Sequence, residues 1–151
     1  MFRGAYPVTL DVKGRMAMPT RFRDELVERS HGRMVITVDR SDRCLLIYTQ
    51  PDWEIIEQKL VKLPTLNKAT RRLQRLMIGH AAEVELDGNG RLLIPPALRE
   101  FAMLTRDAML VGQGGRFELW AEAHWNERRE AWLKVDEDDE PLPPELESLS
   151  L

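Results

Sequence analysis

The chain contains one pattern of apolar, turn-forming and arginine residues twice. In the second copy, residues 83–86 alternate polar and apolar side chains, residues 87–90 read Asp-Gly-Asn-Gly, and residues 91–94 are again mostly apolar. A period of two on either side of residues that tolerate positive φ predicts two short strands joined by a turn. Residues 6–18 have the same form, and the pattern predicts the same strand–turn–strand unit there.

Each strand pair is followed by residues that favour a short helix. Pro19 and Pro95 fit the first turn of a helix, where a missing backbone N–H removes no helical hydrogen bond. The apolar residues at helical spacing, which we expect to form the buried faces, are Phe22 and Leu26 in the first copy and Leu98 with Phe101 or Ala102 in the second.

A hairpin and a second helix are predicted to complete each copy. The expected hairpin strands are 34–38 with 44–48, and 109–111 with 117–120. Thr49 to Asp52 has the form of a capping box, which predicts a helix that carries Trp53 and ends before Pro64. Trp125 takes the matching place in the second copy. Both tryptophans follow helix starts on apolar faces, and we expect them to be core residues.

A linking helix is predicted between the two copies, over residues 67–78. Its apolar positions are Leu66, Ala69, Leu73 and Leu76 or Met77, and its opposite face carries only basic residues, Lys68, Arg71, Arg72 and Arg75. Such a face is typical of a solvated helix surface. Ion pairs with a neighbouring subunit and direct contact with DNA are the alternatives.

The predicted fold is α+β and mainly β, with four short strands and two helices in each copy. A twofold repeat of such strands indicates one small closed barrel with pseudo-twofold symmetry and flanking helices. Each copy alone is near the size at which a core becomes marginal, so we expect one shared core. The predicted segments are a first repeat with its helix at 5–62, a linking helix at 63–80, a second repeat with its helix at 81–135, and an acidic tail at 136–151.

Composition indicates a soluble cytoplasmic protein whose body is basic. Cys44 is the single cysteine, which excludes internal disulfides and multi-cysteine zinc sites, and no apolar run approaches the length of a membrane span. Residues 136–151 hold seven acids and no Lys or Arg, so the remaining 22 basic and 18 acidic residues give the body a net charge of +4. This charge allows a nucleic-acid partner. The acids and prolines of the tail predict a solvated, poorly ordered segment.

The sequence contains no recognisable catalytic, cofactor or metal site. His31, His80 and His124 lack a His or Cys partner at metal-ligand spacing, and the chain has no nucleophile elbow or phosphate loop. Gly88 and Gly90 lack the third glycine and the following helix of a dinucleotide-binding loop. We therefore expect no enzyme, cofactor or metal.

The repeated chemistry is a unit Asp-x-x-Gly-Arg, formed by Asp11, Gly14 and Arg15 and again by Asp87, Gly90 and Arg91. In the structural interpretation, the aspartate stabilises the turn, glycine supplies positive φ, and arginine pairs with the aspartate. In the functional interpretation, a rigid turn presents the arginine to phosphates or guanine edges, which its guanidinium can bind with two parallel hydrogen bonds. We interpret aspartate and glycine as structural, and predict DNA contact for Lys13, Arg15, Arg23, Arg91 and Arg99.

These residues carry a family resemblance. Leu-Asp-x-x-Gly-Arg, followed by three apolar residues and Pro-x-x-x-Arg, resembles the signature of the SpoVT/AbrB swapped-hairpin superfamily of bacterial DNA-binding proteins. Two copies in a chain that begins Met-Phe-Arg-Gly, with segments 71–80 and 109–113, resemble the MraZ family. The resemblance implies tandem swapped-hairpin, AbrB-like repeats.

The resemblance also implies a function. Members of this family repress the division and cell-wall gene cluster that contains their own gene, by binding repeated sites in double-stranded DNA, and form ring-like homo-oligomers in the cytoplasm and nucleoid. The recognition role carries over to Asp11 and Arg15 and to Asp87 and Arg91, and from single-copy relatives to Arg23 and Arg99.

Two departures and two alternatives qualify the resemblance. Asp24 and Glu100 stand where single-copy relatives often have a second basic residue, and Asn89 replaces Lys13, so we expect the first repeat to bind DNA better. One alternative is an antitoxin, in which the same fold is the DNA-binding half; it would carry a toxin-binding tail and co-purify with a small partner. The other alternative is the self-cleaving enzyme of the related barrels, which needs a Gly-Ser dipeptide that this chain lacks.

Overall fold

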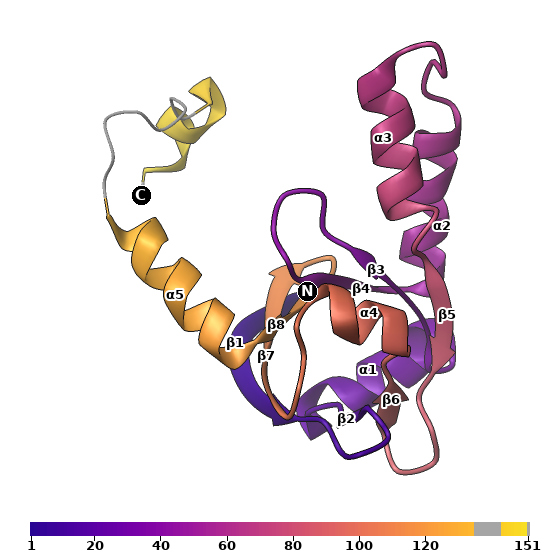
Figure 1. The fold of residues 1–151 in the computed structure, drawn as a ribbon, viewed down its shortest axis with the longest axis vertical. Helices are drawn as coiled ribbons and strands as arrows, with labels where there is room; N and C mark the ends of the chain where they lie inside the picture. The colour runs from indigo at the N-terminus through magenta and orange to yellow at the C-terminus, as the bar shows by residue number, and fades with distance from the viewer. Residues whose placement is uncertain (135–142, 151) are drawn as a thin grey trace.

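Both repeats fold into the same order of elements: two strands, a helix, a hairpin and a second helix (Figure 1). The computed structural model describes residues 1–134 and 143–150. The first repeat consists of β1 (Phe2–Thr9), β2 (Arg15–Ala17), α1 (Thr20–Ser30), β3 (Arg33–Val38), β4 (Leu45–Thr49) and α2 (Gln50–Val61). After the linking helix α3 (Lys68–Met77), the second consists of β5 (Ala82–Glu85), β6 (Arg91–Leu93), α4 (Pro96–Phe101), β7 (Asp107–Gly114), β8 (Phe117–Ala121) and α5 (Glu122–Leu133).

The helix starts differ in detail from the predictions. Pro19 and Pro95 are the residues before α1 and α4, one position earlier than expected. Thr49 precedes α2, but its side chain makes no capping hydrogen bond, so the predicted capping box is wrong. The reason is that Thr49 also ends β4, where pairing with Met34 holds it in the sheet and leaves it buried.

The main sheet has six antiparallel strands in the order β1-β7-β8-β4-β3-β5. The two predicted hairpins, β3–β4 and β7–β8, meet at its centre, where Leu45 of β4 lies opposite Leu119 of β8. Each outer strand comes from the other repeat, because β1 pairs with β7 and β5 pairs with β3. The two repeats are therefore interleaved within one sheet.

The closed barrel predicted from the sequence is wrong. Among the described residues, β1 and β5 are the edges of the main sheet, and β2 pairs with β6 in a separate two-stranded sheet. The physical reason lies in the turns at 11–14 and 87–90, which carry β2 and β6 away from the main sheet, so that a single bridge between Leu10 and Met16 joins β2 to the end of β1. The division into four segments remains a prediction.

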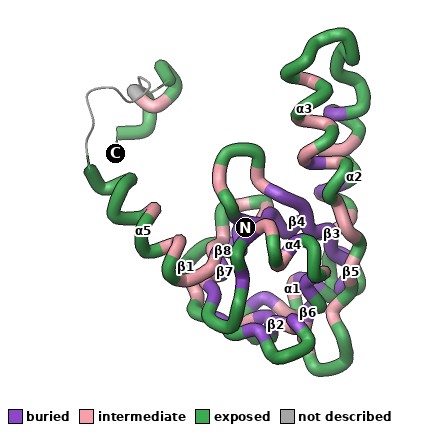
Figure 2. Tube along the Cα trace, in the orientation of Figure 1, coloured by how far each residue is buried: buried purple, intermediate pink, exposed green. Residues whose placement is uncertain are grey.

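One shared core lies between the main sheet, the β2–β6 sheet and helices α1 and α4 (Figure 2). It combines residues of both repeats, including Phe2, Phe22 and Phe117, whose rings lie within 5.8 Å of one another. The predicted helix faces are confirmed, with Phe22, Leu26, Leu98 and Ala102 buried. A smaller cluster on the other side of β3 and β4 contains Trp53 and residues of α2 and α3. Trp53 is thus a core residue as predicted, whereas Trp125 is half-buried.

The linking helix α3 begins after Asn67, whose side-chain oxygen accepts the backbone N–H of Ala69 at 2.8 Å. Leu66 lies before the helix and is 96% exposed, so its predicted place on the apolar face is wrong. In Figure 1, α2 and α3 project from one side of the sheet and α5 projects from the other. None of the described helices is both long and apolar enough to cross a membrane. The acidic run 136–140 lies outside the described residues; beyond it, η1 (Pro144–Leu149) is a short 3-10 helix.

Candidate nucleic-acid interface

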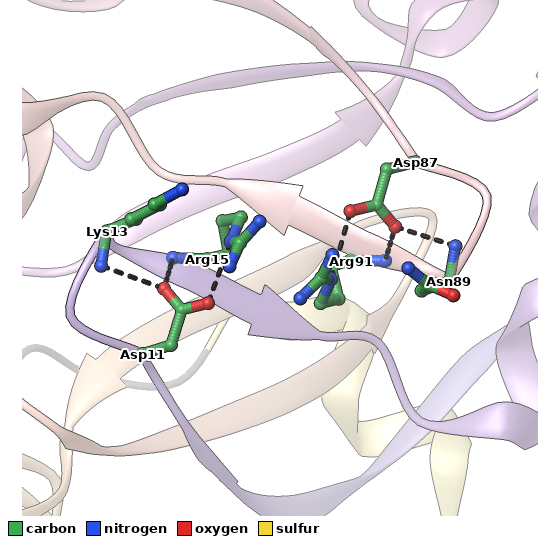
Figure 3. A network of polar contacts seen from close by, with 6 residues as sticks. All are labelled: Asp11, Lys13, Arg15, Asp87, Asn89 and Arg91. Atoms are coloured by element: carbon green, nitrogen blue, oxygen red, sulfur yellow. Dashed lines mark hydrogen bonds and ion pairs between the residues drawn. The ribbon is translucent and has the colours of Figure 1, made fainter.

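The two repeated motifs come together in the β2–β6 sheet. Its register places Arg15 opposite Leu93, Met16 opposite Leu92 and Ala17 opposite Arg91. Arg15 and Arg91 are therefore diagonal neighbours on one face, a relation that places Cα atoms about 7–8 Å apart. Figure 3 shows the two strands side by side, with a motif turn at either end.

The two faces of this small sheet differ in chemistry. Met16 and Leu92 point into the shared core and are 0% exposed. The opposite face carries Arg15, Ala17, Arg91 and Leu93, with Leu93 50% exposed. A buried apolar face fixes the sheet to the body, so the arginine face is presented to solvent on a rigid support.

The Asp11 side chain organises the first turn. Its Oδ1 accepts the backbone N–H groups of Lys13 at 3.0 Å and Arg15 at 2.9 Å, and its Oδ2 accepts Arg15 Nε at 2.7 Å. The Gly14 N–H donates to the Asp11 carbonyl at 2.9 Å, and Gly14 has φ +84°. The hydrogen bond from the Arg15 backbone N–H contributes most to holding the pKa of Asp11 below its ordinary value.

The second turn repeats this arrangement around Asp87. Its Oδ1 accepts the N–H groups of Asn89 and Arg91, each at 2.9 Å, and its Oδ2 accepts Arg91 Nε at 3.0 Å. The backbone hydrogen bond from Arg91 again contributes most to lowering the pKa of Asp87. Both carboxylates are therefore ionised at neutral pH and oppose part of the arginine charge.

The contacts expected under the structural interpretation are present in both turns, and they occupy only one guanidinium nitrogen of each motif arginine. Each motif arginine uses Nε to bind its aspartate, while its side chain is 29% exposed for Arg15 and 31% for Arg91. Among the described residues, the two terminal nitrogens of either guanidinium make no hydrogen bond. The aspartate thus fixes the direction of the arginine and leaves its two-nitrogen end available to a ligand. Lys13 is exposed in the first turn, and the shorter, uncharged Asn89 occupies its place in the second.

Arg23 and Arg99 lie beside the turns, and each lies beside the turn of the other repeat. Arg23 of α1 covers Gly90, and Arg99 of α4 covers Gly14. Their Nε atoms donate to the carbonyls of Met18 and Ile94, at 2.7 and 3.0 Å. The sequence analysis predicted DNA contact for both arginines, but the sequence carries no signal for this crossing, because it depends on the pairing of β2 with β6.

The sequence analysis did not predict a cluster of three polar residues at one end of the main sheet. Asp39, Cys44 and Glu118 bring potential ligand atoms within 4.8 Å of one another. Asp39 accepts the N–H groups of Ser41 and Asp42, and Glu118 accepts Trp120 Nε1. Burial raises the pKa of both Cys44 and Glu118, which favours their neutral forms over the anions that bind a cation. The geometry is that of an internal polar cluster.

The basic face of α3 is exposed at all four positions, Lys68, Arg71, Arg72 and Arg75, and it forms no ion pair within residues 1–134 and 143–150. It lies at the opposite end of the molecule from the β2–β6 sheet (Figure 1). The structure therefore places two separate arginine-bearing surfaces on the protein, of which the β2–β6 face carries the repeated motif.

Comparison with known proteins identifies the relatives of the chain. A family model for MraZ proteins, described as antitoxin-like, matches residues 1–76 and 77–138. A protein of Thioalkalivibrio sulfidiphilus is 58% identical over 153 residues, one of Coxiella burnetii is 55% identical over 152, and one of Pseudomonas aeruginosa is 56% identical over 151. Each alignment covers 100% of both chains, and each relative is named a transcriptional regulator MraZ. This chain belongs to the MraZ family.

Proposed function

We propose that this chain is a sequence-specific DNA-binding transcriptional regulator that represses the division and cell-wall operon containing its own gene. The observation that carries the proposal is the solvent-facing side of the β2–β6 sheet, where Arg15 and Arg91 each have an aspartate-fixed Nε and an available guanidinium end. A two-stranded sheet of this kind fits the major groove of B-DNA, and arginine is the residue that most often binds guanine there.

The residues around this face have distinct proposed roles. Arg15 and Arg91 contact base edges or phosphates, and exposed Lys13 contacts the backbone beside the first turn. Half-buried Arg23 and Arg99 lie next to the turns and belong to the same basic surface. Asp11, Gly14, Asp87 and Gly90 shape the turns and do not contact DNA. Because Asn89 replaces Lys13, the first turn binds the backbone more strongly than the second.

The proposed assembly is a ring-like homo-oligomer that binds several direct repeats upstream of its own operon, in the cytoplasm and nucleoid. One β2–β6 face offers two motif arginines, which is too little base contact to select a single site in a genome. Linked copies raise the effective concentration at the second and third repeat. Direct repeats require head-to-tail neighbours, and such interfaces close into rings when the rotation permits.

A footprint on the DNA upstream of the chain's own gene tests the function. We expect protection at several short direct repeats and loss of protection with the double variant Arg15→Ala/Arg91→Ala. Arg129→Ala is the matched control, because it removes one exposed positive charge from α5, away from the β2–β6 face. Normal protection by the folded double variant would refute the assignment of this face.

The assembly has its own test. Light scattering is expected to give a mass several times the 17.5 kDa of one chain, and affinity is expected to drop steeply when a multi-repeat duplex is cut to one repeat. A monomer that binds single and multiple repeats equally well would contradict the proposed assembly while leaving the DNA-binding face untouched.

A further inference from the structure

Arg23 and Arg99 fill the space that a side chain would occupy at the turn glycines of the opposite repeat. A Cβ atom placed on Gly90 would lie 2.5 Å from Arg23 Nε and 2.7 Å from its Cζ. A Cβ atom on Gly14 would lie 2.5 Å from both the Nε and the Cζ of Arg99. Each guanidinium is thus packed directly on a turn whose glycine has positive φ, +72° at Gly90 and +84° at Gly14. We call Arg23 and Arg99 the crossed arginines.

The crossed arginines are anchored in their own repeat. Arg23 Nε donates to the Met18 carbonyl at 2.7 Å, and the Met18 N–H donates to the Gly90 carbonyl at 2.9 Å. In the other half, Arg99 Nε donates to the Ile94 carbonyl at 3.0 Å, and the Ile94 N–H donates to the Gly14 carbonyl at 2.9 Å. Met18, which follows β2, therefore binds both Arg23 and the turn that Arg23 covers. Ile94, which follows β6, does the same for Arg99.

We propose that Arg23 and Arg99 are positioning residues that hold the DNA-contacting turn of the opposite repeat. Arg23 holds the 87–91 turn and so fixes Arg91, while Arg99 holds the 11–15 turn and so fixes Arg15. The effect on DNA rests on the proposed function, because rigid arginines lose less conformational freedom when they bind. The contacts themselves exist in the free protein and can be tested without DNA.

Substitution by lysine distinguishes a positioning role of the crossed arginines from a role that depends on their charge alone. Arg23→Lys keeps one positive charge near any bound phosphate, but it loses the planar group that covers Gly90 and the Nε that binds Met18. A residue that acts only through charge is largely replaced by lysine. A crossed arginine is not, so its lysine variant should behave like its alanine variant.

The test is hydrogen–deuterium exchange of the full-length free protein. The Gly90 and Gly14 amides donate to Asp87 and Asp11 within their turns, so their exchange reports how well each turn is held. For Arg23→Lys we expect exchange in 87–91 to accelerate on the order of tenfold, the effect of losing one hydrogen bond of ordinary strength. Exchange in 11–15 should match the wild type. Arg99→Lys should give the reverse pattern, and Arg21→Lys, on the same helix as Arg23, should alter neither turn.

A second variant tests the contact between Arg23 and Gly90 by changing the glycine. Gly90→Ala places a methyl group where the Arg23 guanidinium lies, and the φ of +72° at this position strains its own turn as well. Exchange should therefore rise in residues 18–23 and 87–91 and stay unchanged in 94–99. For Arg23→Lys, acceleration in 11–15 alone, in both turns equally, throughout the sheet or in neither turn would overturn the proposal. For Gly90→Ala, unchanged exchange in residues 18–23 would overturn it as well. If the crossed pattern appears but Arg15→Ala binds DNA normally, the positioning of the turns stands and only the proposed function fails.

Discussion

Replacing Arg15 by alanine should weaken DNA binding and leave the stability of the fold almost unchanged. The Asp11–Arg15 ion pair is solvent-exposed, and such pairs contribute little to folding. Asp11 also keeps its hydrogen bonds to the Lys13 and Arg15 backbone N–H groups, which the substitution does not remove. We therefore expect Arg15→Ala to unfold at a urea concentration close to that of the wild type.

The expected loss of DNA affinity is larger. The terminal nitrogens of Arg15 can form one bidentate contact, and each such contact is worth about 1–3 kcal/mol, which corresponds to a loss of affinity of about 5- to 150-fold. A duplex with one repeat measures a single contact. On a duplex with several repeats, the losses of neighbouring copies multiply. Arg91→Ala should have the smaller effect, because Asn89 makes the second turn the less basic one.

Fluorescence anisotropy at several salt concentrations distinguishes the two kinds of contact. Loss of a phosphate contact weakens binding to every sequence alike and lowers the salt dependence by about one counterion. Loss of a base contact weakens the operator alone. Arg129→Ala removes the same charge from α5 and should change operator affinity little. A folded Arg15→Ala variant with wild-type affinity on the single-repeat duplex would refute the assignment of Arg15.

Three further predictions concern the turns, the core and the tail. The lowered pKa values of Asp11 and Asp87 mean that their stabilisation is present above the ordinary value of 3.8 and is lost as pH falls through the lower folded values. Hydrogen exchange in the turns, corrected for intrinsic rates, should therefore accelerate at acid pH, and no acceleration would contradict the pKa shifts. Leu92→Ala, at a 0% exposed position, should destabilise the protein by about 2–5 kcal/mol in urea unfolding, whereas Leu93→Ala, at a 50% exposed one, should have little effect. Equal effects would mean that the two faces of the β2–β6 sheet are wrongly assigned. Deleting residues 136–151 removes seven acids and should raise affinity for competitor DNA of random sequence, most at low salt. Identical competition curves would place the tail far from bound DNA.

Local sequence signals predicted the elements well. The Asp-Gly-Asn-Gly turn located β5 and β6, and Asn67 marked the start of α3, because these residues act on the backbone within a few positions. The small size of each repeat correctly predicted that the two repeats share one core. The turn contacts of Asp11 and Arg15 followed from the same local chemistry.

Local sequence signals could not predict which strands pair with each other across the two repeats. Alternation shows that β1 and β5 are strands, but it carries no information that β1 pairs with β7 and β5 with β3. Nor does it show that β2 and β6 leave the main sheet and pair with each other, and the predicted barrel failed for this reason. The packing of Arg23 on Gly90 also depends on strand pairing, since the two residues are brought together only when β2 and β6 lie side by side. The capping box at Thr49 failed because pairing in β4 determines where that side chain lies.

The covalent link between the repeats has a consequence for the orientation of bound DNA. In a symmetric dimer of identical chains, both turns would be the same, and the dimer would bind equally well in either direction along a duplex. Here one turn carries Lys13 and the other Asn89, so the β2–β6 face has a distinguishable beginning and end. With the proposed function, each copy would bind its site in one polarity. Copies bound to direct repeats would then all point the same way along the duplex.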